Sequence, residues 1–224
     1  MLPCPVIILI FGLEDKMEQT TQSVPEAPKP APSKKKNPFA GLRNFSFREW
    51  CYRNRYYLLA FFIPALVIYI AYLCFQAYPV GDRCVLVLDL NGQYVYYFEY
   101  LKKAIFGGSS LTYSWGRNLS GEFMGIIGYY LASPFTLIVA LLPRKMLLGS
   151  LMIMQLAKVG ASSVAFCYLL QKGRGSKPMP ALICGFAYAT CAYMVYQLMN
   201  PMWLDGMIFI PFIVLGIERM INTG

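Results

Sequence analysis

The acidic residue at position 89 is the strongest candidate for chemistry in the sequence. Asp89 directly follows an apolar run; if the next segment is helical, Gln93 stands one turn further on, and Tyr97 and Tyr100 continue the same face. A carboxylate, an amide and phenols on one face could bind a hydroxylated ligand, and a carboxylate can take a proton from a hydroxyl. The structural alternative is that Asp89 caps the following helix, since Asp is favoured at helix N-caps.

Three further charged residues occupy positions where chemistry could occur. Lys158 falls inside an apolar segment, and an ionisable side chain inside a membrane is costly unless it has a partner. It could meet a lipid phosphate or pair structurally with an acid on another helix. Asp205 stands near Trp203 in the short segment 200–205, where Trp is typical of a membrane interface and Asp could merely begin the next helix. Arg117 lies in a loop rich in Ser, Gly and Asn, where a charge is more often simply solvated.

The composition restricts both the chemistry and the class of protein. The 224 residues include no His, which excludes Ser-His-Asp and Cys-His catalysis and imidazole metal sites. Charged residues make up 14% and hydrophobic residues 57%, whereas a soluble domain is about a quarter charged. We interpret the net charge of +9 as a signal for topology and lipid contact. We expect no nucleic-acid partner, because no recognisable binding module accompanies the basic residues.

Long uncharged segments indicate helices that cross a membrane. About 20 apolar residues are needed to span a bilayer, and four segments are interpreted as spans: residues 56–78, 146–170, 180–199 and 206–219. The sequence therefore predicts an all-α, polytopic membrane protein with about four spans and additional juxtamembrane or re-entrant helices. Residues 1–55 form a separate basic N-terminal segment, and residues 56–224 form the transmembrane module.

The N-terminal segment sets the expected orientation. Residues 18–38 are Pro-rich, polar and basic and are predicted to be disordered, while residues 39–55 alternate aromatic and Arg residues as at a membrane interface. The basic cluster before the first span places the N-terminus in the cytoplasm by the positive-inside rule. Residues 79–145 then form the first extracytoplasmic loop. Met17 is an alternative start of the protein.

Within that loop the sequence predicts one helix and one broken segment. Residues 91–106 have the pattern of an interfacial amphipathic helix, which the Gly pair at 107–108 ends. Residues 123–142 are long enough to span, but Ser133-Pro134 interrupts their centre, and we interpret them as non-spanning half-helices. This interpretation places three basic residues inside and only two outside. The three are Lys172, Arg174 and Lys177, and the two are Arg144 and Lys145.

Several motifs, in order along the chain, resemble the N-terminal part of the bacterial YfhO family of membrane proteins. They are the stretch YPVGDRCVLVLDLNGQYVYYFEYLKKAIFGG, the loop with Asn118 and Gly121, the stretch YYLASPFTLIVALLP, the helix with Lys158, and the stretch NPMWLDGMIFIPFIVLGIERM. The resemblance covers roughly residues 50–224. Members of this family are several times longer, so we interpret the chain as the N-terminal portion of a longer protein.

The resemblance implies an enzyme. The family is similar to the GT-C superfamily of glycosyltransferases, which use polyprenyl-phosphate-linked sugars and place an acidic residue in the first extracytoplasmic loop, flanked by juxtamembrane helices. The implied function is transfer of a sugar from a polyprenyl-phosphate donor to a cell-surface acceptor, such as teichoic acid or another glycan. The implied partners are therefore the lipid bilayer, the polyprenyl-phosphate sugar and a cell-envelope glycan.

The resemblance also assigns roles to individual residues. Asp89 matches the acid of the first loop, where it would be the base or a metal ligand, and Asp205 assists it, so both are candidate catalytic residues. The leaving phosphate needs positive charge from Lys, Arg or a divalent metal; hard oxygen ligands would favour Mg²⁺ or Mn²⁺, but the sequence assigns no metal ligand. The candidate substrate-binding residues are Gln93, Tyr94, Arg117, Lys158 and Trp203.

Two other interpretations stay open. The chain could be a non-enzymatic multi-pass membrane protein, such as a transporter or lipid-handling subunit, in which Lys158 and the outer acids form a translocation path or structural pairs. The isolated chain could also be inactive, because its helices present polar faces that need further partners.

Overall fold

The computed structural model describes residues 46–78, 81–116 and 120–223. All of these belong to one unit, Ser46–Gly224. The expectations for residues 1–45, including the Pro-rich segment and the start at Met17, lie outside the described residues, and so does Arg117.

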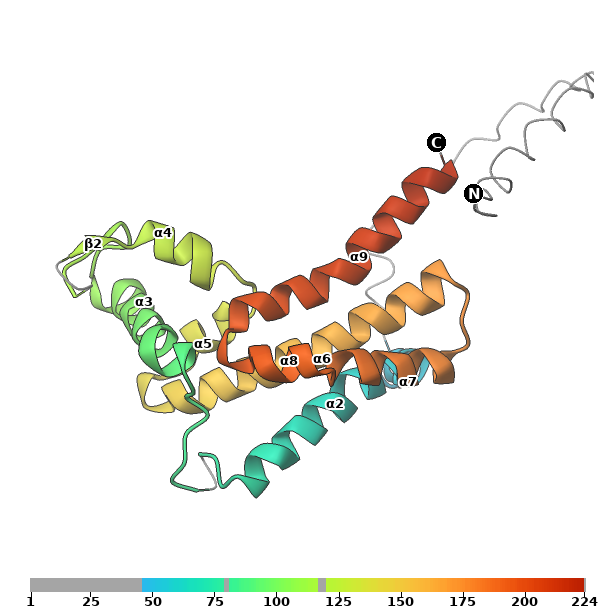
Figure 1. The fold of residues 1–224 in the computed structure, drawn as a ribbon, viewed down its shortest axis with the longest axis horizontal. Coiled ribbons are helices and arrows are strands. Elements are labelled where there is room, and N and C mark those ends of the chain that lie inside the picture. The colour runs from blue at the N-terminus through green and yellow to red at the C-terminus, as the bar shows by residue number, and fades with distance from the viewer. Residues whose placement is uncertain (1–45, 79–80, 117–119, 224) are drawn as a thin grey trace, which may run out of the picture. The chain divides into compact units, whose positions relative to one another are not determined.

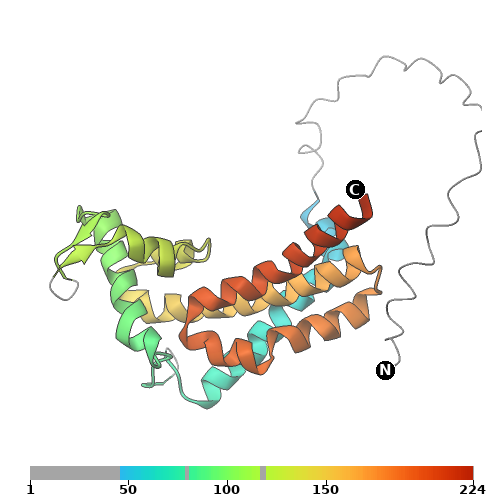
Figure 2. The ribbon, with the colours of Figure 1, turned by 45° about the horizontal axis from the view of Figure 1, so that its top comes forward.

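Four helices form a bundle in which one of them is central. α2 (Arg55–Cys74), α7 (Pro178–Ala189) and α9 (Pro201–Thr223) all pack on α6 (Leu147–Gly173), as Figures 1 and 2 show. The glycines of α6 and α7 allow close approach: a Cβ at Gly160 would lie 2.7 Å from the Phe61 carbonyl oxygen of α2. Small residues at helix contacts are typical of membrane bundles. α2 meanwhile directs large apolar side chains outward, among them Phe62 and Leu66.

The helix lengths confirm an all-α membrane protein. Within the described residues, two segments are long and apolar enough to cross a bilayer. They are Arg55–Cys74, and Arg144–Gly173, which joins the short turn η4 (Arg144–Met146) to α6. A third is the pair formed by α7 with the segment Ala192–Met199, bent by 43°. The fourth expected span, residues 206–219, falls within α9, and its crossing of the membrane stays a prediction.

The structure differs from the sequence-based expectation at two helix boundaries. The helix expected over residues 180–199 breaks after α7, and α8 (Ala192–Tyr196) and the turn η5 (Gln197–Met199) follow. The Thr190 hydroxyl donates back to the Phe186 carbonyl at 2.8 Å, a bond that bends helices. The short outer turn expected over residues 200–205 is wrong in extent, because α9 already begins at Pro201; Pro suits the first helical position, where its missing N–H has no partner to lose.

A group of shorter elements lies beside the first turns of α6, and we call residues 90–141 the side layer (Figure 1). It begins with the π-helical turn η2 (Leu90–Tyr94) and α3 (Val95–Gly107). A two-stranded hairpin follows, β1 (Tyr113–Ser114) with β2 (Gly121–Glu122). The layer ends with α4 (Met124–Ile126), the second π-helical turn η3 (Ile127–Leu131) and α5 (Thr136–Leu141).

The side layer confirms two predictions about local structure. The predicted helix over residues 91–106 is present, and it ends where Gly108 takes a left-handed conformation with φ of 74°, which costs Gly no steric strain. The predicted break at Ser133-Pro134 separates η3 from α5, so residues 123–142 form short pieces and no single spanning helix. The predicted interfacial segment is described only from Ser46, where α1 (Phe47–Arg53) exposes Phe47 and Tyr52.

Apolar packing holds the side layer to the bundle, and one buried cation ties α3 to the end of α5. Leu90, Phe98, Phe123 and Val139 share a core with Leu151 and Met154 of α6. Lys102 of α3 is also buried, and its ammonium donates to the Leu142 carbonyl at 2.6 Å. Burial, reinforced by the nearby Arg144, lowers the pKa of Lys102. The carbonyls after α5 stabilise the charge, since a helix C-terminus carries partial negative charge.

The ends of α6 offer a test of orientation. Arg144 and Lys172 are exposed at opposite ends of the segment Arg144–Gly173, so they lie on opposite sides if it spans. In a cysteine-free background, we expect Arg144→Cys in intact cells to react with a membrane-impermeant maleimide, and Lys172→Cys to react only after permeabilisation. Labelling of position 172 from outside would overturn the assignment of the N-terminus to the cytoplasm.

Candidate functional site

A hydrogen-bonded cluster forms around Asp89 where the side layer meets the bundle. The Asn200 amide donates to one oxygen of Asp89 at 2.9 Å, and the Tyr94 hydroxyl donates to the Asn200 amide oxygen at 2.7 Å. Asp89 and Asn200 are half-buried, and Tyr94 is fully buried. Residues more than a hundred positions apart in the chain thus fix the direction of one carboxylate.

The π-helical turn explains why Tyr94, and not Gln93, completes this cluster. In η2 the Val95 N–H donates to the Leu90 carbonyl, five residues back. The wider turn places residues five apart on one face, so Tyr94 lies on the same face as Asp89 and Gln93 does not. Such π-turns are frequent at functional sites. Asp89 stands at the N-cap position of η2 but makes no capping bond, so the capping interpretation is wrong.

A second cluster surrounds Asp205, in the second turn of α9. The Lys158 ammonium forms an ion pair with Asp205 at 2.9 Å and also donates to the Pro201 carbonyl at 2.9 Å. The Ser133 hydroxyl donates to the other Asp205 oxygen at 3.0 Å. Only 2% of the Lys158 side chain and 17% of the Asp205 side chain are exposed. Lys158 therefore has the acidic partner that one interpretation of the sequence required.

The two clusters are joined by the backbone between α8 and α9, which α6 holds in place. Gln155, one turn before Lys158, donates to the Leu198 carbonyl at 2.6 Å and accepts from the Tyr72 hydroxyl of α2 at 3.0 Å. Irregular backbone at membrane depth is tolerated only where such partners satisfy it. Gln155 and Lys158 thus fix the junction that carries Asn200 at its end.

The two acids differ in their hydrogen-bond and ion-pair partners. Both oxygens of Asp205 are engaged, by Lys158 and Ser133, whereas Asp89 accepts one hydrogen bond and has no ion pair among the residues that the structure describes. Burial raises the pKa of Tyr94 well above its ordinary value, so its hydroxyl stays protonated and orients Asn200. The free carboxylate oxygen of Asp89 is therefore the group best placed to accept a proton.

The remaining predicted site residues are placed less centrally. Gln93 is half-buried and makes no hydrogen bond within the described part of the chain. Trp203 lies in the first turn of α9 and is largely exposed. Neither joins the two clusters. Arg117 lies outside the described residues.

Sequence reasoning missed three residues of the site: Asn200, Ser133 and Gln155. In the sequence, Ser133 stands out only as part of a helix break, and Asn200 only as the first residue of the short segment 200–205. The available signal is the polar spacing on α6, where Gln155 and Lys158 stand three residues apart on one face of an apolar helix. Costly polar groups on one face indicate a polar partner inside the bundle.

Across residues 46–78, 81–116 and 120–223, no three His, Cys, Asp or Glu residues gather where they could hold a metal ion. Asp205 is already neutralised by Lys158, which leaves the single free oxygen of Asp89.

The fold and these clusters define an integral membrane protein in which polar side chains meet at a junction of broken helices. A family model described as bacterial membrane protein YfhO matches residues 60–224, which is most of the chain. The chain belongs to this family. No curated protein and no solved structure gives a significant match.

Replacing Lys158 tests whether the buried ion pair holds the junction. We expect Lys158→Met to lower the free energy of unfolding by about 3 kcal/mol, because it leaves a largely buried carboxylate without its cation. The same change at Lys103, whose pair with Glu99 is about half exposed, should cost less than about 1 kcal/mol. Adding Asp205→Leu to Lys158→Met should restore part of the loss. Unfolding of the purified protein in detergent measures all three, and equal losses at Lys158 and Lys103 would contradict the role.

Proposed function

We propose that this chain is a membrane glycosyltransferase module of the GT-C type, which transfers a sugar from a polyprenyl-phosphate donor to a cell-surface acceptor such as teichoic acid. The observation that carries the proposal is the half-buried Asp89 carboxylate, oriented by Asn200 and with one oxygen free. The expected placement of residues 79–145 outside the cell supports it, because lipid-linked sugars can serve as donors where nucleotide sugars are absent.

In the proposed reaction, Asp89 acts as general base. The free oxygen of Asp89 takes the proton of the acceptor hydroxyl, while the acceptor oxygen attacks the anomeric carbon of the donor. The new bond joins the acceptor oxygen to the anomeric carbon, and the bond from that carbon to the phosphate oxygen breaks. Polyprenyl phosphate leaves with the electron pair, and the proton remains on Asp89.

The other residues of the two clusters and the remaining predicted residues take supporting roles in this scheme. Asn200 and the buried Tyr94 position the base, and Asp205 positions Lys158. The Lys158 ammonium donates to Asp205 and Pro201, and only 2% of its side chain is exposed, so in this scheme Lys158 holds the junction and does not contact the donor phosphate. Gln93, Arg117 and Trp203 would contact the sugar or lipid. No step is assigned to a metal ion, because the described acids do not gather into a metal site.

Replacing the base tests the proposal directly. Asp89→Asn keeps the shape and one hydrogen-bonding oxygen but removes the basic group, so we expect sugar transfer to fall by about 100-fold or more with unchanged expression and insertion. Asp82→Asn, an exposed acid seven residues earlier, is the matched control and should keep full activity. Transfer of radiolabelled sugar from polyprenyl phosphate in isolated membranes is the measurement. Unchanged surface glycosylation in cells with Asp89→Asn would count against the enzyme.

A pH profile tests the contact between Asn200 and Asp89. Asn200→Asp places a second carboxylate within hydrogen-bond distance of the first, and neighbouring like charges raise a carboxyl pKa. The base must be ionised to act, so a raised pKa moves the acid limb of the rate profile to higher pH, by about one unit or more. Asn222→Asp, an exposed position at the far end of α9, should leave the profile unchanged. An unshifted acid limb in Asn200→Asp would separate Asp89 from catalysis.

A second candidate function is transport or lipid handling without catalysis. The buried pair of Lys158 and Asp205 supports it, because paired charges inside a membrane bundle often line a translocation path. In that case Lys158→Met would reduce substrate flux more than Asp89→Asn. The glycosyltransferase proposal predicts the opposite order: at matched protein levels, Asp89→Asn should reduce sugar transfer more than Lys158→Met.

A further inference from the structure

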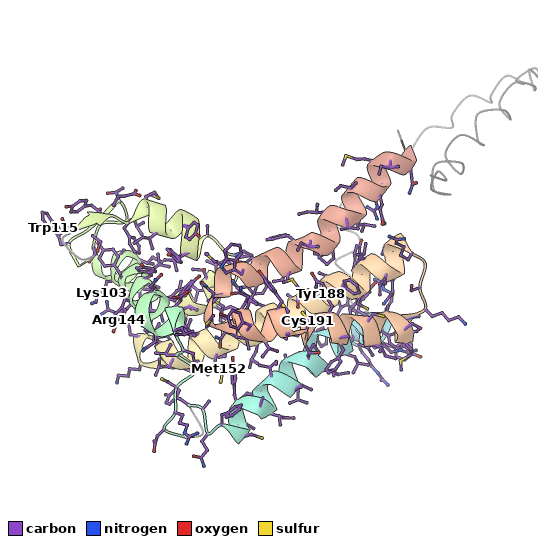
Figure 3. The ribbon with its side chains drawn as sticks, in the orientation of Figure 1. Lys103, Trp115, Arg144, Met152, Tyr188 and Cys191 are labelled. Atoms are coloured by element: carbon purple, nitrogen blue, oxygen red, sulfur yellow. The ribbon has the colours of Figure 1, made fainter. Side chains whose placement is uncertain are left out.

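A cavity on the side of α3 that faces away from the bundle is separate from the two polar clusters. It has a volume of about 370 Å³ and lies between α3, the β1–β2 hairpin and α4. Its lining includes four aromatic side chains and one ion pair: Tyr96, Tyr97, Tyr100, Phe123, Glu99 and Lys103. Figure 3 labels Lys103 on α3 and Trp115 at the hairpin. Small-molecule sites are concave and combine aromatic side chains with placed polar groups; this cavity is concave and has both kinds of lining.

The surrounding contacts fix most of this lining in place. The Tyr100 ring packs against Phe123 at 4.4 Å between centroids, and its hydroxyl donates to the carbonyls of Ser110 and Tyr113. Tyr97 packs against Tyr130. These contacts tie α3 to the hairpin and to η3, so the walls are preformed and little ordering is needed when a ligand binds.

One aromatic ring is left available. Tyr96 is 62% exposed, and its hydroxyl has no hydrogen bond within the described part of the chain. A sugar ring presents an apolar face of C–H groups, which packs on an aromatic ring, and a rim of hydroxyls, which need donors and acceptors. Glu99 supplies acceptors and Lys103 supplies donors, 3.0 Å apart.

The charge of the lining favours a neutral ligand. Glu99 and Lys103 are the charged residues among those that line the cavity, and they form a pair. A phosphate or carboxylate would gain from Lys103 but be repelled by Glu99. A hydroxylated, uncharged ligand can use both at once.

The geometry points to a binding subsite for a neutral sugar unit of the acceptor glycan. The assignment to the acceptor rests on the proposed function: Gly92, which lines the cavity, lies three residues from Asp89. A glycan seated on Tyr96 would reach the base by passing around η2, because Asp89 faces the bundle on the other side of this segment. Binding of the saccharide itself does not depend on the transfer reaction.

The test is calorimetric titration of the protein in lipid nanodiscs with soluble saccharides. The neutral probes are trisaccharides of glucose, galactose and N-acetylglucosamine, and the anionic probe is a galacturonic acid trimer. We expect at least one neutral probe to bind, and to bind more tightly than the anionic one. Tyr96→Ala should weaken that binding about tenfold through loss of the stacking face, whereas Tyr96→Phe should weaken it by less.

Tyr129→Ala is the matched control, because Tyr129 is 61% exposed in the same layer but does not line the cavity. The Tyr129→Ala variant should bind saccharide normally, and circular dichroism should show equal helix content in all variants. No binding by any neutral probe, tighter binding of the anionic one, or equal losses in Tyr96→Ala and Tyr129→Ala would each overturn the subsite.

The variant Asp89→Asn separates the subsite from the enzyme proposal. Asp89→Asn should bind saccharide normally. If it also transfers sugar normally, the enzyme proposal fails and the subsite stands. If transfer depends on Asp89 but no saccharide binds, the subsite fails and the enzyme proposal stands.

Discussion

The junction between α8 and α9 is the feature on which the site depends. A helix that breaks leaves carbonyl groups without helical partners, and a buried carbonyl needs another donor. Gln155 and Lys158 of α6 supply donors to the carbonyls of Leu198 and Pro201. With these bonds the break is stable, and Asn200 is held at a defined position facing Asp89. The polar residues of α6 thus act at a distance on the group proposed to do chemistry.

The two acids illustrate how burial and pairing divide similar residues into different roles. Asp205 is locked by a cation and a hydroxyl, and removing either leaves an unsatisfied buried group. Asp89 is oriented by a neutral amide, which fixes its direction without neutralising its charge. A carboxylate that must accept a proton is better served by the second arrangement. This contrast ranks Asp89 above Asp205 as a base, although the sequence offered both as catalytic.

The side layer connects this site to the proposed saccharide surface. The π-turn η2 directs Asp89 and Tyr94 toward the bundle, while α3 directs Tyr96, Glu99 and Lys103 to the cavity on its other side. The segment η2–α3 therefore carries residues of both sites on opposite faces. Its core contacts with α6 fix the position of both sites relative to the bundle. The membrane-spanning helices provide the rigid support, and the layer carries the residues proposed to meet substrate.

The sequence by itself determined the class of the protein, because apolar length and the scarcity of charge admit only membrane helices. It also determined the C-terminal end of α3 and the break at Ser133-Pro134, since Gly and Pro act locally on the backbone. The partners of Asp89, Asp205 and Lys158 were decided only by the tertiary structure. They come from segments dozens of residues apart. The π-turn at Leu90–Tyr94, which brings Tyr94 to this cluster, depends on packing that no local pattern encodes.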